Sequence, residues 1–426
     1  MNILLIGNGF DLAHGLPTKY RDFLSFIKIV KAVVIDDNYS PEFDSNFNSK
    51  LQEILEGDKE NDWNDLLLYR EEWRTLVENN VWIDYFLQYV WDEKENWIDF
   101  EKEISKVIQI IDNDISVGKY NLDRTVNKIS NKFFDDYFIE DYWGKCDEMR
   151  TMKAAEIYKK CGDWKKTEEI ADKYFKDNPI IAEKEEIKYS DLILRLQMDL
   201  DKMIRALEIY LEMYVKKLPC VNLQKDIEKL DVDHVLSFNY TDTYERLYNN
   251  AENVRYNYIH GKAKLKNIIE NNNMVLGIDD YLQSEMADND TTFVAFKKYY
   301  QRIIKSTDNL YMSWLSNISY ECQKCKERMH WDQNKQLDLA VYRELGTLHY
   351  LHIFGHSLDV TDKDILREII LNDNVYTTIY YHSKDGIEKK ELGKKVANLI
   401  KIIGKENTIK LTSGETKRIE FKMQEN

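Results

Sequence analysis

Residues 2–11 read Asn2-Ile3-Leu4-Leu5-Ile6-Gly7-Asn8-Gly9-Phe10-Asp11. The continuous apolar run at 2–6 is typical of a strand that is buried on both faces of a parallel sheet. Gly7 and Gly9 end this strand in a tight turn, and a helix is expected to begin near Arg21. The order of strand, turn and helix indicates an α/β fold.

Further strands are expected after residue 230, and helices separate several of them. The expected strands are 234–238, 254–259, 274–276, 348–354 and 377–381, and the expected helices are 244–250, 293–305 and 362–371. Alternating strands and helices indicate a parallel sheet with helices on both faces. Because the strand at 2–6 joins this later set, the sequence predicts a discontinuous Rossmann-type domain made of residues 1–39 and 226–426.

Residues 40–225 differ from the rest of the chain in composition and periodicity. Glycine is rare there, and apolar residues recur three and four positions apart. The clearest helical stripe runs from Leu192 to Leu218, and Pro219 ends it. Residues 152–179 are interpreted as a plain helical hairpin, with a single helix-turn-helix repeat as the less favoured reading. We therefore expect a large all-α insertion at 40–225.

The composition excludes several classes of protein. The chain has 426 residues, of which 43% are hydrophobic, and its net charge is −16. This acidic balance disfavours binding to a nucleic-acid backbone. No apolar stretch reaches the roughly 18 residues of a membrane span, so a membrane protein is not expected. Five sparse cysteines favour reduced thiols and a cytoplasmic location.

Polar and glycine-containing segments follow four of the expected strands. Ligands of parallel sheets bind outside the carboxyl ends of the strands, so these segments form the candidate site. They are Gly7-Asn8-Gly9-Phe10-Asp11, Asn239-Tyr240-Thr241-Asp242, His260-Gly261 and Gly355-His356-Ser357-Leu358-Asp359. Each segment alone also fits a turn or a helix cap. Their shared edge of the sheet favours a ligand site.

The residue types in these segments indicate binding of a nucleotide. The backbone N–H groups of residues 7–9 can approach a phosphate closely, although Leu12 replaces the third glycine of the usual dinucleotide motif. The amide of Asn239 can hold a ribose hydroxyl or a water. His260 lies beside Gly261 at the end of an expected strand and is a candidate general base.

Together these segments resemble the sirtuin-like NAD-binding fold. Gly7-Asn8-Gly9-Phe10-Asp11 and the following Gly15-Leu16-Pro17 resemble the sirtuin Gly-Ala-Gly-x-Ser and Gly-Ile-Pro. Phe238-Asn239-Tyr240 resembles the Gln-Asn-Ile of the nicotinamide pocket. Ile259-His260-Gly261 resembles the Leu-His-Gly of the catalytic histidine, and Phe354-Gly355-His356-Ser357-Leu358 resembles the Gly-Thr-Ser-Leu loop. The order along the chain agrees in all four.

A closer resemblance is to the bacteriophage abortive-infection AbiH family. Residues 7–18, with Tyr20 and Phe23, look like the opening of that family. The blocks Asn96-Trp97-Ile98-Asp99-Phe100-Glu101, Ser237-Phe238-Asn239-Tyr240-Thr241 and Gly355-His356-Ser357-Leu358 fit it too. The resemblance spans most of the chain, in short blocks with a variable helical middle.

The resemblance implies a phage-defence protein that cleaves the nicotinamide–ribose bond of NAD without a metal. The implied catalytic residues are His260, Asn239, Asp99 and Glu101. The implied NAD-binding residues are Gly7, Asn8, Gly9, Phe10, Asp11, His14, Pro17, Tyr20, Tyr240, Gly261, Gly355, His356 and Ser357. Asp99 and Glu101 are two apart, so on a helix only one of them is expected to face the site.

Two departures from the sirtuin pattern reduce the set of activities that the resemblance implies. Asp11 replaces the sirtuin serine, and Cys322 with Cys325 is the sole cysteine pair. A zinc ribbon needs two such pairs, so protein deacylation is disfavoured. Two alternatives stay open: a sensor that binds NAD or ADP-ribose without catalysis, and a nucleic-acid-targeting effector, which the acidic charge disfavours. A constitutive NADase would kill its host, so a phage-derived trigger or a homo-oligomer is an expected partner.

Overall fold

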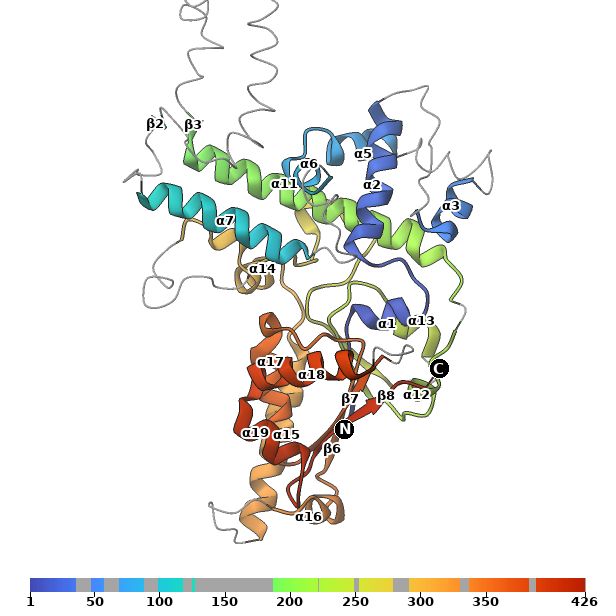
Figure 1. The fold of residues 1–426 in the computed structure, drawn as a ribbon, viewed down its shortest axis with the longest axis vertical. Coiled ribbons are helices and arrows are strands. Elements are labelled where there is room, and N and C mark those ends of the chain that lie inside the picture. The colour runs from blue at the N-terminus through green and yellow to red at the C-terminus, as the bar shows by residue number, and fades with distance from the viewer. Residues whose placement is uncertain are drawn as a thin grey trace, which may run out of the picture.

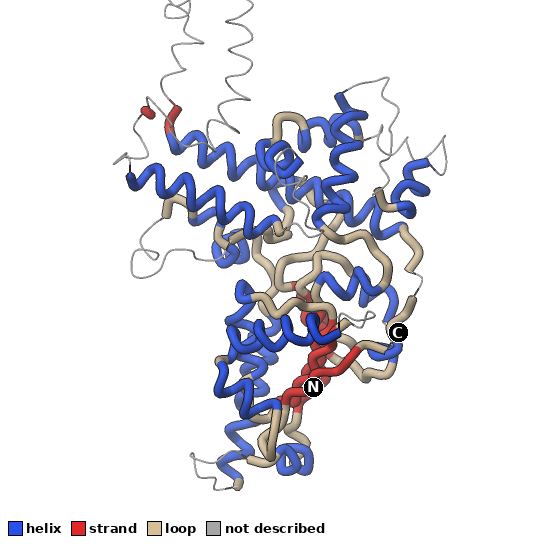
Figure 2. The backbone as a smooth tube through the Cα atoms, in the orientation of Figure 1, coloured by secondary structure: helices blue, strands red, loops and turns tan. Residues whose placement is uncertain are grey.

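The computed structural model describes residues 1–35, 47–56, 69–87, 99–117, 125–126, 187–220, 222–248, 253–278, 291–329, 337–382 and 388–425. The hairpin expected at 152–179 lies outside them. A helical layer covers one edge of a sheet domain (Figure 1). Loops fill the region between the strands and the helices of that layer (Figure 2). No described helix is long and apolar enough to cross a membrane.

The sheet has six strands, all parallel. They are β1 (Asn2–Ile6), β4 (His234–Ser237), β5 (Arg255–Tyr258), β6 (His349–Phe354), β7 (Val375–Tyr381) and β8 (Ile419–Met423). Their order is β5-β4-β1-β6-β7-β8. Numbered along the chain, this is the 3-2-1-4-5-6 order of doubly wound dinucleotide-binding sheets, whose direction of winding reverses beside the first strand. The predicted α/β fold with a parallel sheet is confirmed.

Successive side chains of β1 enter different hydrophobic clusters, because alternate residues of a strand face opposite sides of a sheet. Leu4 and Ile6 pack with residues of α1 (Asn8–Ala13), α12 (Lys225–Glu228) and α13 (Thr243–Tyr248). Ile3 and Leu5 pack with α15 (Leu310–Arg328), α17 (Lys363–Ile370), α18 (Glu388–Ile403) and α19 (Lys405–Thr412). Helices therefore cover both faces of the sheet (Figure 1).

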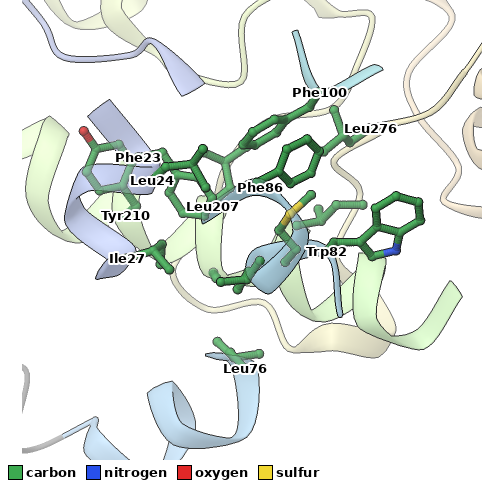
Figure 3. Close-up of a cluster of buried hydrophobic side chains, with 14 of the residues drawn as sticks. Phe23, Leu24, Ile27, Leu76, Trp82, Phe86, Phe100, Leu207, Tyr210 and Leu276 are labelled. Atoms are coloured by element: carbon green, nitrogen blue, oxygen red, sulfur yellow. The ribbon is translucent and has the colours of Figure 1, made fainter. Parts of the chain in front are cut away.

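The helical layer has a hydrophobic core of its own, part of which Figure 3 shows. It is built from α2 (Tyr20–Ile35), α3 (Ser49–Glu56), α5 (Arg70–Val77), α6 (Val81–Tyr85), α7 (Phe100–Val117) and α11 (Tyr189–Ile209). Met274, Leu276 and Phe296 complete the core from outside 40–225, and Leu276 lies beside Phe86 in Figure 3. Two short strands, β2 (Thr125–Val126) and β3 (Ile187–Lys188), pair within the segment expected to be all-α.

The stripe predicted from Leu192 to Leu218 is buried wherever its side chains are described, as at Leu196, Leu207 and Leu218. α11 does not continue as a regular helix. It passes into a π-helix at Tyr210–Tyr214 and a 3₁₀ turn at Val215–Lys217. The Tyr210 hydroxyl donates to the carbonyl of Pro17 at 2.7 Å, so the irregular segment joins the helical layer to the loop after β1.

The strand expected at 274–276 is wrong. This apolar run is a buried loop in which the Val275 N–H donates to the His260 carbonyl at 2.8 Å. The Gln301 side chain from α14 (Lys298–Ile304) bonds both the N–H and the carbonyl of Leu276. The Gln301 side chain thus makes the backbone hydrogen bonds that a neighbouring strand would otherwise make. The edge strand β8 and the short helix α16 (Leu339–Glu344) were not predicted.

Candidate functional site

Strand register brings the predicted site segments together. Ile6 lies opposite both Ser237 and Phe354, and Ser237 lies opposite Tyr258. Counting on two positions from these four residues gives Asn8, Asn239, His356 and His260. Neighbouring strands are roughly 4.8 Å apart. Residues distant in sequence therefore meet at one level, beyond the carboxyl ends of β5, β4, β1 and β6.

A cavity of about 700 Å³ lies at this edge, between the strand-end loops and the helical layer. Leu207 and Leu211 also line it. The predicted residues on its wall are Gly7, Asn8, Gly9, Asp11, Tyr20, Asp99, Glu101, Asn239, Tyr240, His260, Gly355, His356 and Ser357. The predicted catalytic residues His260, Asn239, Asp99 and Glu101 therefore all line this cavity.

Four predicted residues lie away from the cavity wall. Phe10 belongs to a hydrophobic core cluster. His14 is buried, with Nδ1 2.7 Å from the Phe10 carbonyl and Nε2 2.6 Å from the Tyr248 hydroxyl. The Pro17 carbonyl receives the Tyr210 hydrogen bond. Gly261 has a φ of +80° and its α-carbon packs against the Asn273 backbone. Each of the four makes contacts that support the fold.

The glycines after β1 and β6 pack backbone against backbone. The Gly7 N–H donates to the Phe354 carbonyl at 3.2 Å, and the Gly9 N–H donates to the Gly355 carbonyl at 2.8 Å. A Cβ on Gly355, whose φ is +69°, would stand 2.1 Å from the Phe10 nitrogen. Of the N–H groups at residues 7–9 that were expected to approach a phosphate, those of Gly7 and Gly9 are therefore bonded within the protein. Both donors are engaged, and the glycines serve the contact between the loops.

Asp11 is a buried carboxylate on the cavity wall, with 1% of its surface exposed. Its Oδ2 accepts from the Thr241 hydroxyl at 2.7 Å and from Asn239 Nδ2 at 3.2 Å. Its Oδ1 has no partner among the described residues. Burial raises the pKa of Asp11 to about 6, and the nearby hydroxyl groups of Thr241 and Thr243 oppose that rise.

Asp362 joins the two histidines of the site. One oxygen lies 3.4 Å from His260 Nε2, and the other lies 3.3 Å from His356 Nε2. Burial alone would raise the pKa of Asp362, but the bonds to His260 and His356 and the charge of Lys298 hold that pKa well below its ordinary value. Asp362 is therefore an anion at neutral pH.

The hydrogen bonds determine which ring nitrogens face Asp362. The Leu358 N–H donates to His356 Nδ1 at 3.0 Å, so that nitrogen is an acceptor and Nε2 carries the proton. Leu358 adopts a φ of +60° and is fully buried. His260 also turns Nε2 toward Asp362, and its buried Nδ1 has no partner among the described residues.

The helical layer contributes an ion pair to the cavity wall. Lys298 Nζ lies 2.7 Å from Glu101 Oε2 and 3.8 Å from Asp362 Oδ1. Burial raises the pKa of Glu101, and the charges of Lys298 and His260 oppose that rise. Asp99 also lines the cavity, and its Oδ1 accepts from the Lys102 N–H at 3.1 Å. Contrary to expectation, both acidic residues face the site.

Two tyrosines line the same wall. The Tyr20 ring stacks on Phe100, with centroids 4.0 Å apart. The Tyr240 hydroxyl donates to the Val275 carbonyl at 2.7 Å. Burial raises the pKa of both phenols well above the ordinary value. They are neutral at physiological pH and supply flat surface and hydroxyl groups.

A comparison with known protein families identifies the family of this chain. The family model described as bacteriophage abortive infection AbiH matches residues 3–382. The chain belongs to the AbiH family. Searches of curated proteins and of solved structures each found no match. The AbiH match covers β1 to β7 and every residue of the cavity wall. A role in phage defence through abortive infection follows from the family.

Lys298 and Asp362 were not predicted as site residues of this AbiH protein. Both fell within expected helices, at 293–305 and 362–371, and neither belongs to a motif. The available signal for Asp362 was its position within ten residues of the end of β6. Within the described ranges, no three His, Cys, Asp or Glu side chains are arranged to hold a metal. Cys322 and Cys325 are buried thiols on α15.

Proposed function

We propose that this AbiH protein hydrolyses the nicotinamide–ribose bond of NAD. The observation that carries the proposal is the cavity at the carboxyl edge of the sheet, with His260, Asn239 and Glu101 on its wall. Dinucleotides bind at this edge of sheets with the same strand order. The cavity volume of about 700 Å³ lies within the range of small-molecule sites.

His260 is the proposed general base. Its Nε2 faces the Asp362 carboxylate, so the lone pair of its neutral ring is at Nδ1. A water held by Asn239 attacks the anomeric carbon and gives a proton to Nδ1. The C–N bond breaks, and its electrons neutralise the cationic nicotinamide ring. Asp362 orients the histidine and stabilises the imidazolium that forms.

Negative charge on the wall suits the transition state. Breaking a glycosidic bond develops positive charge on the ribose, as in an oxocarbenium ion. Asp362 is ionised and Glu101 is paired with Lys298, so negative carboxylate charge is already positioned at the site. Such preorganised charge stabilises the transition state more than the ground state.

The diphosphate needs a different position from the one that the glycine motif indicated. Lys102 lies on the cavity wall in the first turn of α7 and is exposed. A lysine ammonium is a common phosphate partner in proteins. We therefore assign the diphosphate to the α7 side of the cavity, and the nicotinamide riboside to the strand-end loops.

The test is NAD loss and nicotinamide release by the purified full chain, with and without a lysate of phage-infected cells as a source of trigger. His260→Ala should lower the rate by roughly 10²–10⁴-fold, the usual contribution of a general base. Asn239→Ala should also lower it. His382→Ala is the matched control, because His382 is exposed and lies outside the cavity wall.

Other outcomes favour the alternatives. Calorimetric binding of NAD or ADP-ribose without turnover, unchanged in His260→Ala, would contradict the hydrolase and support a sensor. Cleavage of labelled RNA that requires His260 would support a nucleic-acid effector. Equal NAD loss with wild type and His260→Ala would reject the proposed base.

A further inference from the structure

We infer that Asp11, Asn239 and His260 form an acceptor site that selects a neutral ligand group rich in N–H or O–H donors. Asp11 is its specificity-determining residue. The inference rests on the proposed function, because it takes NAD as the ligand. It adds which part of that ligand the strand-end loops recognise, and why an anionic group does not fit there.

Three side chains on the cavity wall share one property. Asp11, Asn239 and His260 are 1%, 5% and 8% exposed, and all three line the cavity. Each has a buried polar atom without a hydrogen-bond partner among the described residues: Asp11 Oδ1, Asn239 Oδ1 and His260 Nδ1. Buried polar atoms are bonded in the large majority of cases, so this grouping on one wall points to a ligand.

All three atoms are acceptors. An ionised carboxylate can only accept, and Asn239 already donates its Nδ2 to Asp11 Oδ2. His260 turns Nε2 toward the Asp362 carboxylate, which leaves a lone pair on Nδ1. The three residues therefore present oxygen and nitrogen lone pairs, beside the second N–H of the Asn239 amide.

Two backbone N–H groups beside these acceptors are already bonded within the protein. The Gly7 and Gly9 N–H groups are engaged by the loop after β6. A phosphate or carboxylate placed against Asp11 Oδ1, Asn239 Oδ1 and His260 Nδ1 would meet three acceptor atoms. A group with several donors complements the site, and NAD carries two such groups: the hydroxyls of the nicotinamide ribose and the NH₂ of the carboxamide.

The experiment is calorimetric binding of NAD and of ADP-ribose to wild type and Asp11→Asn. The variant keeps the shape of the side chain, and its amide oxygen can keep the bonds from Thr241 and Asn239. Its NH₂ then replaces Oδ1, so a donor stands where an acceptor stood. We expect the dissociation constant to rise by about tenfold or more, the usual effect of one unmade buried hydrogen bond.

Asp226→Asn is the matched control. Asp226 is also buried, and it accepts from Lys422 Nζ and from the Glu425 N–H away from the cavity. It should leave both dissociation constants unchanged. Asn239→Ala is a second test variant and should weaken binding in the same direction. NAD is titrated in the cold, with nicotinamide release followed so that only intact NAD is counted.

The two ligands separate the two donor groups. ADP-ribose keeps the ribose hydroxyls and lacks the carboxamide. Equal weakening of both ligands by Asp11→Asn assigns the site to the ribose, and weakening of NAD alone assigns it to the carboxamide. Unchanged binding of both ligands would overturn the inference and leave the proposed function standing. Failure of wild type to bind either ligand would overturn both.

Discussion

Glu208 in the helical layer and Asp11 at the sheet edge are both fully buried carboxylates, but their surroundings differ. Glu208 Oε1 accepts from the Lys264 N–H and Asn267, and Oε2 accepts from Arg205 and Asn272, at 2.6–2.9 Å. Both of its oxygens are therefore satisfied. Asp11 directs both of its bonds to Oδ2 and leaves Oδ1 without one among the described residues.

This difference in hydrogen bonding distinguishes Glu208, a structural carboxylate, from Asp11, a carboxylate with an oxygen available to a ligand. Three of the four donors to Glu208 tie α11 to residues 264–272, the segment that follows His260 and Gly261, and the fourth is Arg205 on α11 itself. A buried charge with complete bonding holds elements together, whereas incomplete bonding costs free energy. Asp11 carries that cost on the wall of the cavity. The three predictions that follow test this contrast.

Glu208→Ala should cause the largest change in stability. It removes the acceptor of four donors and leaves Arg205, which is 3% exposed, without its partner on α11. We expect a loss of about 3–5 kcal/mol in the free energy of unfolding, measured by denaturant titration. Glu212→Ala is the control, because Glu212 forms a partly exposed pair with Lys216 in the irregular segment that follows α11. Equal losses in the two variants would remove the contrast.

Asp11→Asn should stabilise the protein at neutral pH. Burial raises the pKa of Asp11 from 3.8 to about 6, so the folded chain binds this proton more tightly than the unfolded chain does. The resulting stability is complete below about pH 4 and is lost as the pH rises through 6. Removing the charge should gain about 2–3 kcal/mol at pH 7.

Denaturant titration at several pH values measures that gain. The difference between Asp11→Asn and wild type should shrink as the pH falls from 7 toward 4, because wild-type Asp11 then becomes neutral. A variant that is less stable than wild type at pH 7 would show that the Asp11 charge supports the fold. Asp11 would then be a structural carboxylate, as Glu208 is.

Tyr210→Phe should have the smallest effect. It removes one neutral hydrogen bond, from the π-helical segment to the Pro17 carbonyl. We expect a loss of about 1 kcal/mol in the free energy of unfolding. Tyr320→Phe is the control, because Tyr320 is 57% exposed. A loss as large as that of Glu208→Ala would mean that this single bond holds the two layers together.

Much of the sheet could be predicted from sequence, because buried parallel strands are continuous apolar runs. Residues 3–6 of β1 are an example. The run at 274–276 looks the same, but Gln301 satisfies its backbone in place of a strand. Strand β8 alternates apolar and charged residues over Ile419–Met423 at the edge of the sheet. Such a short pattern is hard to tell from a loop.

The site was predictable where strand ends carry unusual residues. Asn239, His260 and His356 were found in this way, and the register explains why they meet. Lys298 and Asp362 were not found, because their role depends on a contact between the two layers. The glycine motif was recognised, but the use of its N–H groups depends on Gly355, which is far away in sequence.

The register of β1 also has a consequence for synthesis of the chain. Ile3 pairs with His234 on one side and with Leu351 on the other, so its partners follow about 230 and 350 residues later. At translation rates of roughly 5–20 residues per second, the apolar β1 segment waits about ten seconds or longer for its first neighbour. Chaperones have that interval to bind it, and the cavity is completed only after the loop that follows β6 has left the ribosome.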